Sequence, residues 1–216
     1  STWSFHGGIK LPGHKDMSTG KPIARMPSSD RYVIPLNQHM GAEGEVLVST
    51  GDKVLKGQML AGPHGLISAT VHSPVSGKVA EITQHHFPHP SGLAGTCIVI
   101  ENDHEDEWVE RNPIGEDYTN ISSHNLRNIV RDAGIVGLGG AIFPAAVKQT
   151  EVGIETLILN GVECEPYITC DDMLMRERAD GIIKGAKIIA HIIKAEQCII
   201  AIEDNKPEAI EAITGQ

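Results

Sequence analysis

The order of apolar and polar residues changes in character about halfway along the 216-residue chain. Residues 31–102 hold short apolar runs that are separated by glycine, proline and other turn residues. Such runs, bounded by turn signals, are typical of β-strands. They are YVIPL, EVLV, LISATV, GKVAEI and TCIVI. The pattern predicts an all-β domain over residues 31–102.

From residue 122 onward the apolar positions follow a helical period. Ser122 or Ser123 is expected to cap a first helix. The run ETLILN predicts a buried strand, a long helix capped by Asp171 and Asp172 is expected to follow, and QCIIAIE predicts a second strand. Strand, crossover helix and strand form a βαβ unit with parallel pairing. We therefore expect an α/β domain over residues 122–216, with ligands beyond the carboxyl ends of its strands.

Two further segments complete the predicted organisation. Residues 1–30 are expected to be an extended N-terminal segment. Residues 103–121 are rich in carboxylates and contain Pro113 and Gly115, which predicts an acidic, solvated linker. Only one more helical stretch, KPEAIEAI, follows the second predicted strand of the α/β domain, so we expect an incomplete sheet and a fragment of a longer polypeptide. The predicted fold class is α/β, with an all-β module before a Rossmann-like domain that is truncated at its C-terminus.

Composition disfavours several classes of function. The formal net charge is −10, whereas proteins that bind a phosphate backbone gather Lys and Arg on one face. Nucleic acid is therefore not an expected partner. The four cysteines form no CxxC pair, so no zinc or iron–sulfur site and no metal-binding residue is predicted. No apolar run approaches the ~20 residues of a membrane span, and we expect no direct span.

Gly137, Gly139 and Gly140 belong to the first motif with chemical potential, GLGGAIFP. Glycines let backbone amides approach an anion or a ring closely, and Pro144 suits the first turn of a short helix after the motif. Lys148 could add a positive charge to the same anion. A single motif of this kind is more often a glycine-rich turn beside a buried Phe, so a second motif is needed to indicate a site.

The second motif, NGVECEPY, begins where the first predicted strand of the α/β domain ends. Asn160, Glu163 and Glu165 place an amide and two carboxylates there. These groups can bind ribose hydroxyls, ring N–H groups or a carboxamide. The two motifs together predict a flavin or nucleotide site between Gly134 and Asp172.

The two motifs, at this separation, resemble those of the flavin subunit family of respiratory complex I, which read approximately GRGGAGFPTGLK and NADExEPG. The resemblance is closer to the C subunits of Rnf electron-transport complexes, through FHGGIKLP, GIVGLGGAIFP and NGVECEPYITCDD, and covers essentially the whole chain. In the all-β half, GDKVLKGQ and VHSPVSGKV resemble turns of the barrel-sandwich modules of lipoyl and biotinyl carriers, although the region Ser68 to His72 lacks their modified lysine. The resemblance implies a barrel-sandwich module followed by an FMN-binding domain.

The resemblance also implies cofactor contacts, residue by residue. Those for FMN and NADH are Gly137, Gly139, Gly140, Phe143, Lys148, Asn160, Glu163 and Glu165. The three glycines would cradle FMN, with the lysine and the asparagine also in contact with it. Phe143 would stack on the dinucleotide, Glu163 would lie near the flavin ring, and Glu165 would hold the nicotinamide half of NADH. Hydride transfer from nicotinamide C4 to flavin N5 needs no side-chain acid or base, so no catalytic residue is predicted.

The function implied by the resemblance is that of an NADH-dependent oxidoreductase subunit, peripheral on the cytoplasmic face of the bacterial inner membrane. Electrons would pass from NADH through FMN to iron–sulfur carriers, with other subunits of the membrane Rnf complex as partners and ferredoxin as an indirect one. The cysteine motif of the family, CxxCxxCxxxCP, is absent from this sequence. Its [4Fe–4S] clusters are therefore expected only in a missing C-terminal part, and this fragment is expected to be inactive alone.

Two other hypotheses stay open. Leu138, Ile142 and Val162 stand where the complex I relatives have Arg, Gly and Asp. The chain could instead be a redox-silent scaffold of a membrane complex, similar to the A subunit of the sodium-pumping quinone reductase. A carrier function would require a modified lysine at a hairpin tip of the all-β module. Titration with FMN tests the scaffold hypothesis, and intact mass tests the carrier hypothesis.

Overall fold

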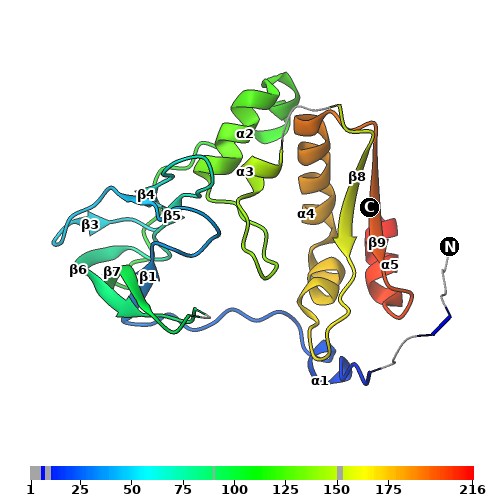
Figure 1. The fold of residues 1–216 in the computed structure, drawn as a ribbon, viewed down its shortest axis with the longest axis horizontal. Coiled ribbons are helices and arrows are strands. Elements are labelled where there is room, and N and C mark those ends of the chain that lie inside the picture. The colour runs from blue at the N-terminus through cyan, green and yellow to red at the C-terminus, as the bar shows by residue number, and fades with distance from the viewer. Residues whose placement is uncertain (1–5, 8–10, 90, 150–152) are drawn as a thin grey trace. The chain divides into compact units, whose positions relative to one another are not determined.

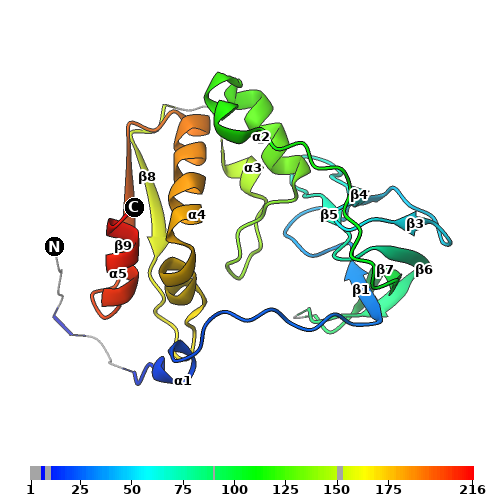
Figure 2. The same cartoon turned by 180° about the vertical axis from the view of Figure 1, so that it is seen from behind.

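The computed structural model describes residues 6–7, 11–89, 91–149 and 153–216. The chain divides into two compact units (Figures 1 and 2). Their limits are Pro27–Thr150 for one unit, and Ser1–Met26 together with Glu151–Gln216 for the other. Each unit has its own cluster of buried apolar side chains.

The Pro27–Thr150 unit contains two antiparallel sheets, in the strand orders β1-β7-β6-β3 and β2-β4-β5. The strands are β1 (Arg31–Pro35), β2 (Glu45–Val46), β3 (Lys53–Val54), β4 (Met59–Gly62), β5 (Val71–His72), β6 (Gly77–His86) and β7 (Ala94–Asn102). Leu60, Val79, Ile98 and Ile100 are fully buried in its core. This arrangement confirms the all-β module, whose apolar runs supply the core. The run LISATV contributes only its last residue, Val71, to a strand, the two-residue β5.

The acidic segment after β7 is bound to the all-β module over its first residues. The Ser76 hydroxyl donates to the Asp103 carboxylate at 2.6 Å. The N–H of Lys56 donates to the Glu107 carbonyl at 2.8 Å, and the N–H of Val109 donates to the Lys56 carbonyl at 3.0 Å. The segment that was expected to be a solvated linker is therefore ordered there by backbone pairing.

Three helical elements complete the described part of this unit. They are the 3-10 helix η1 (Gly115–Asn120) and the α-helices α2 (Ser123–Asp132) and α3 (Ala145–Lys148). Ser122 is the N-cap of α2, and its hydroxyl accepts the N–H of Asn125 at 3.2 Å, in agreement with the predicted cap. The predicted α/β domain began at residue 122. The contacts instead group α2 and α3 with the all-β module.

The other unit is built on a βαβ arrangement, as predicted. Its elements are α1 (Asp16–Thr19), β8 (Thr156–Gly161), α4 (Cys170–Ile193), β9 (Gln197–Ile202) and α5 (Pro207–Thr214). Strands β8 and β9 are parallel, with Thr156 opposite Gln197 and Gly161 opposite Ile202. Helices α4 and α5 share a buried cluster, against which Ile200 and Ile202 of β9 pack. The α/β fold class is therefore confirmed, and α1 lies within the segment that was expected to be extended.

Helix α4 spans 24 residues and is amphipathic. Met175, Ala179 and Ala186 are buried on one face, whereas Asp180 and Lys184 form an exposed pair. Its backbone departs from helical geometry at Arg178, where φ is −135°, so two helical pieces meet there. Among the described residues, no helix combines the length and apolar character needed to cross a membrane.

Gly77, at the start of β6, is a position where only glycine fits. Its φ is +157°, and a Cβ there would lie 2.0 Å from the Glu101 carbonyl oxygen of β7. Gly77→Ala is expected to lower the free energy of unfolding by more than about 2 kcal/mol, because the two strands must separate. Chemical denaturation measures this loss.

Gly51→Ala is the matched control for that substitution. Gly51 has a φ of +97°, but no atom lies within 4 Å of its Cβ position. Only backbone strain of about 1–2 kcal/mol is expected there. Equal losses in the two variants would contradict a steric role for the contact with Glu101.

Candidate functional site

The glycine motif forms a loop between α2 and α3 that is closed at its base. There the N–H of Gly137 donates to the Phe143 carbonyl at 2.8 Å. At the tip, Gly139 and Gly140 are exposed, and no atom lies within 4 Å of a Cβ position at either. Within the described part of the chain, their N–H groups have no backbone acceptor. The tip therefore offers both space and donors to a ligand.

Ile142 follows these glycines in a left-handed backbone conformation, with a φ of +43°. This region is unfavourable for a β-branched residue. Two hydrogen bonds fix it: its N–H donates to the Gly139 carbonyl at 3.0 Å, and its carbonyl accepts the N–H of Met40 at 3.2 Å. Ile142 also lines a cavity of about 540 Å³ together with His39 and Phe87. The all-β module thus helps to set the conformation of the glycine loop.

Phe143 and Lys148 are brought together by α3. The Lys148 ammonium lies 5.3 Å from the centre of the Phe143 ring, which is a cation–π distance. Pro144, expected in the first turn of a short helix, is the N-cap residue of α3. The ring is half-buried and the ammonium is exposed. The positive charge therefore stays accessible to an anion.

The acidic loop is the segment after β8 that carries the motif NGVECEPY. Its three predicted site residues differ in burial. Asn160 and Glu165 are exposed, whereas Glu163 is buried. The Asn160 side-chain oxygen accepts the N–H of Val162 at 3.1 Å, which turns the chain as it leaves the strand. Asn160 and Glu165 can therefore meet a ligand directly, while the carboxylate of Glu163 is engaged within the protein.

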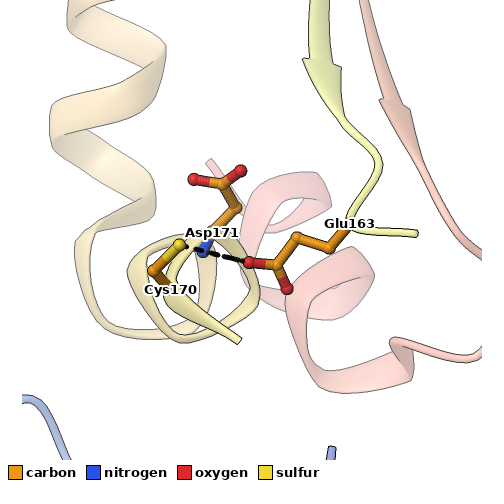
Figure 3. Close-up of side chains that lie close together, drawn as sticks. All are labelled: Glu163, Cys170 and Asp171. Atoms are coloured by element: carbon orange, nitrogen blue, oxygen red, sulfur yellow. Dashed lines mark hydrogen bonds between the residues drawn. The ribbon is translucent and has the colours of Figure 1, made fainter. Parts of the chain in front are cut away.

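Glu163 forms a buried ion pair with Lys206, in the segment between β9 and α5. The Lys206 ammonium lies 2.7 Å from Glu163 Oε2, and the lysine and glutamate side chains are 3% and 2% exposed. Oε1 of the same carboxylate accepts the N–H of Asp171 at 2.6 Å and lies 3.5 Å from Cys170 Sγ (Figure 3). Oε2 also lies 3.4 Å from the N–H of Asp172. Glu163 thus satisfies amides at the start of α4 that have no partner within the helix.

The predicted capping of α4 by Asp171 and Asp172 is therefore wrong. The N-cap residue is Thr169, which makes no side-chain capping bond, and the cap is supplied by the distant Glu163. Asp172 instead pairs with Arg176, with two N···O distances of 2.8 and 2.7 Å. A carboxylate from the preceding loop has taken the place that a local side chain would normally fill.

The pKa values reflect this crowding of carboxylates. Burial opposes the ionisation of Glu163 most strongly, but the hydrogen bonds from Lys206 and Asp171 and the charge of Lys206 outweigh it, so the pKa of Glu163 is lowered. Burial and repulsion by Glu163 raise the pKa of Asp171. Burial, followed by its contact with Glu163, raises the pKa of the Cys170 thiol, which is therefore a poor nucleophile.

Among the described residues, Glu163, Cys170 and Asp171 are the group whose ligand atoms come close enough for a metal ion, all within 4.8 Å of one another (Figure 3). Both carboxylate oxygens of Glu163 already face donors. The Lys206 ammonium, 2.7 Å away, would repel a cation. The arrangement is that of a helix cap with a counter-ion.

Two lysines that contact this loop were missed by the sequence analysis. Lys206 pairs with the Glu163 side chain, and Lys15 donates to the Glu163 carbonyl. Lys206 could have been found, because the carboxyl ends of two parallel strands meet at one edge of a sheet and a buried carboxylate requires a cation there. Lys15 lies 148 residues away and left no local signal.

Comparison with known protein families gives two matches. Residues 3–105 match the RnfC barrel-sandwich hybrid domain. Residues 130–216 match the Nuo51 FMN-binding domain, so this match includes both the glycine loop and the acidic loop.

Individual relatives cover almost the whole chain. It is 50% identical over 213 residues to the C subunit of the ion-translocating oxidoreductase complex of Haemophilus influenzae, which is 98% of this chain and 26% of that protein. Identity to the corresponding protein of Serratia proteamaculans is 49%, and to that of Citrobacter koseri 47%, in each case over 98% of this chain and 30% of the relative. The chain thus spans less than a third of the length of these three curated relatives. The chain is thus similar to RnfC subunits, with a segment that matches the RnfC barrel-sandwich hybrid domain followed by a segment that matches the Nuo51 FMN-binding domain.

Proposed function

We propose that the chain is the FMN-carrying part of a subunit that oxidises NADH in a membrane-bound, ion-translocating electron-transport complex. The match of residues 130–216 to the Nuo51 FMN-binding domain carries this proposal, because that span holds both loops of the predicted site. FMN, when bound, supplies the conversion between two-electron oxidation of a nicotinamide and single-electron transfer. The protein residues bind and orient the two partners.

The proposed contacts fit the chemistry of FMN and NADH. Open backbone at Gly139 and Gly140 can accept a ring or a phosphate, while Gly137 closes the base of the loop through its bond to the Phe143 carbonyl. The exposed ammonium of Lys148, above the Phe143 ring, can meet an anion. The exposed groups of Asn160 and Glu165 can bind hydroxyls or a carboxamide. We propose that Glu163, which has no free oxygen, contributes by fixing the loop near the flavin. These assignments are proposals for each loop by itself.

The proposed setting is a peripheral one on the cytoplasmic face of a bacterial inner membrane. The relatives are named as subunits of ion-translocating oxidoreductase complexes, which supports other members of such a complex as partners. The electrons would leave through [4Fe–4S] carriers towards ferredoxin. We place those clusters outside these 216 residues, because their cysteine motif is not in the sequence.

FMN titration of glycine variants tests this function. Gly139→Ala and Gly140→Ala add a methyl group in open space, so the free energy of unfolding is expected to stay within about 0.5 kcal/mol of wild type. The affinity for FMN, measured by flavin fluorescence, is expected to fall at least about tenfold, because the methyl groups keep the ligand from the backbone.

The control for these variants is Gly20→Ala, at another glycine with no atom within 4 Å of its Cβ position. It is expected to leave FMN affinity unchanged. A wild-type chain without saturable FMN binding would contradict the redox function and favour the scaffold hypothesis. Equal FMN affinity in all variants would show that the glycine loop is not part of the FMN site.

Lys206→Met tests whether the buried pair holds the acidic loop. Removing one partner leaves the Glu163 carboxylate buried without its counter-ion, so the free energy of unfolding at neutral pH is expected to fall by about 3–5 kcal/mol. Lys184→Met removes an exposed pair with Asp180 and is expected to cost no more than about 0.5 kcal/mol. Chemical denaturation compares the two variants, and similar losses would contradict the structural importance of the buried pair.

The pH dependence of stability distinguishes Glu163 from Asp171. Because folding lowers the pKa of Glu163, its contribution is present at neutral pH and is lost as the pH falls below about 4.3, the usual pKa of a glutamate. Folding raises the pKa of Asp171, so its charge opposes folding at neutral pH. Asp171→Asn is therefore expected to raise stability at pH 7 and Glu163→Gln to lower it. Denaturation at neutral and acidic pH measures both, and a loss of stability in Asp171→Asn would contradict this assignment.

A further inference from the structure

Lys15 inserts its ammonium among three backbone carbonyls of the acidic loop. Nζ lies 2.5 Å from the Glu163 carbonyl oxygen, 2.9 Å from that of Glu165 and 2.7 Å from that of Ile168. A lysine ammonium has three N–H donors, and this geometry provides an acceptor for each of them. The three acceptors lie 148 to 153 residues from Lys15 in the sequence.

The carbonyls meet at this point because the loop has left its strand. Residues between the end of β8 and the start of α4 have no ladder partner. Among the three carbonyls, that of Glu163 is partly buried and needs a donor from the protein, whereas the bonds to Glu165 and Ile168 are exposed. A positive charge between three carbonyl dipoles that point at one spot offsets the repulsion between them. Lys15 supplies that charge and binds all three carbonyl oxygens.

The segment around Lys15 is attached to the loop at further points. The N–H of Tyr167 donates to the Gly13 carbonyl at 2.7 Å, and the His14 and Tyr167 rings stack with centroids 4.9 Å apart. The Ser18 and Thr169 hydroxyls lie 2.8 Å apart. The segment that carries Lys15 is therefore attached to the loop on both sides of this residue.

We propose that Lys15 is a positioning residue for the cofactor, acting through the acidic loop. By binding the carbonyls of Glu163, Glu165 and Ile168, it fixes the backbone of the loop. That backbone carries the buried Glu163 side chain and the exposed Glu165 carboxylate. Lys15 itself touches neither FMN nor NADH in this proposal. The inference rests on the proposed function, because it assumes that the acidic loop contacts FMN.

Lys15→Ala, compared with wild type, tests this role. We expect the affinity for FMN to fall at least about tenfold, measured by flavin fluorescence. Amide hydrogen exchange of residues 164–171 is expected to accelerate in the absence of FMN, because the loop loses three of its bonds. Lys21→Ala, at an exposed lysine of the same N-terminal segment, makes the same change of charge and is expected to alter neither quantity. Lys15→Met, which keeps most of the apolar stem, serves if the alanine variant does not fold.

Chemical rescue gives a signature that general destabilisation does not share. Propylammonium has the atoms that Lys15→Ala removes, so it is expected to restore FMN affinity and slow the exchange of the loop. Tetramethylammonium has the same charge without an N–H donor and is expected to restore neither. Equal rescue by both ions, or faster exchange with unchanged FMN affinity, would overturn the positioning role. Failure of wild type to bind FMN contradicts the proposed function, whereas equal binding by wild type and variant contradicts only the role of Lys15.

Discussion

The buried pair of Glu163 and Lys206 is the interaction on which the ligand end of the βαβ unit depends. A carboxylate and an ammonium that are almost fully buried must each find partners, because an isolated buried charge is costly. Here one carboxylate joins the loop after β8, the first turn of α4 and the segment after β9. Removing either charge would therefore disturb three elements at once.

The loop is held from its backbone as well as from this side chain. Lys206 neutralises the carboxylate of Glu163, and Lys15 binds the carbonyl of the same residue. The protein as a whole carries a net charge of −10. At this glutamate, by contrast, two positive charges meet one negative charge. With the inner groups satisfied, Asn160 and Glu165 remain exposed at the loop surface.

Much of the fold follows from hydrophobic periodicity. The all-β module, the cap at Ser122, the parallel strands and the helix between them were all predictable, because each depends on local spacing. The capping of α4 was not, because Asp171 and Asp172 are good local candidates and a distant carboxylate displaced them. The ordered conformation of the acidic segment after β7 was not predicted for a similar reason. Its backbone hydrogen bonds with Lys56 do not depend on the amino-acid composition of the segment.

The candidate site was predictable as two motifs, and its internal roles were not. Glu163 and Glu165 lie two residues apart in the same motif, and nothing in that motif tells their burial apart. In the structure Glu163 is buried and caps α4, whereas Glu165 is exposed. Apolar residues of similar volume would often stabilise such a core as well as an ion pair does. Apolar side chains would not, however, accept hydrogen bonds from the backbone amides of Asp171 and Asp172, as Glu163 does. The charged pair thereby sets where α4 begins relative to the loop. A binding loop at the end of a strand needs that position to stay constant.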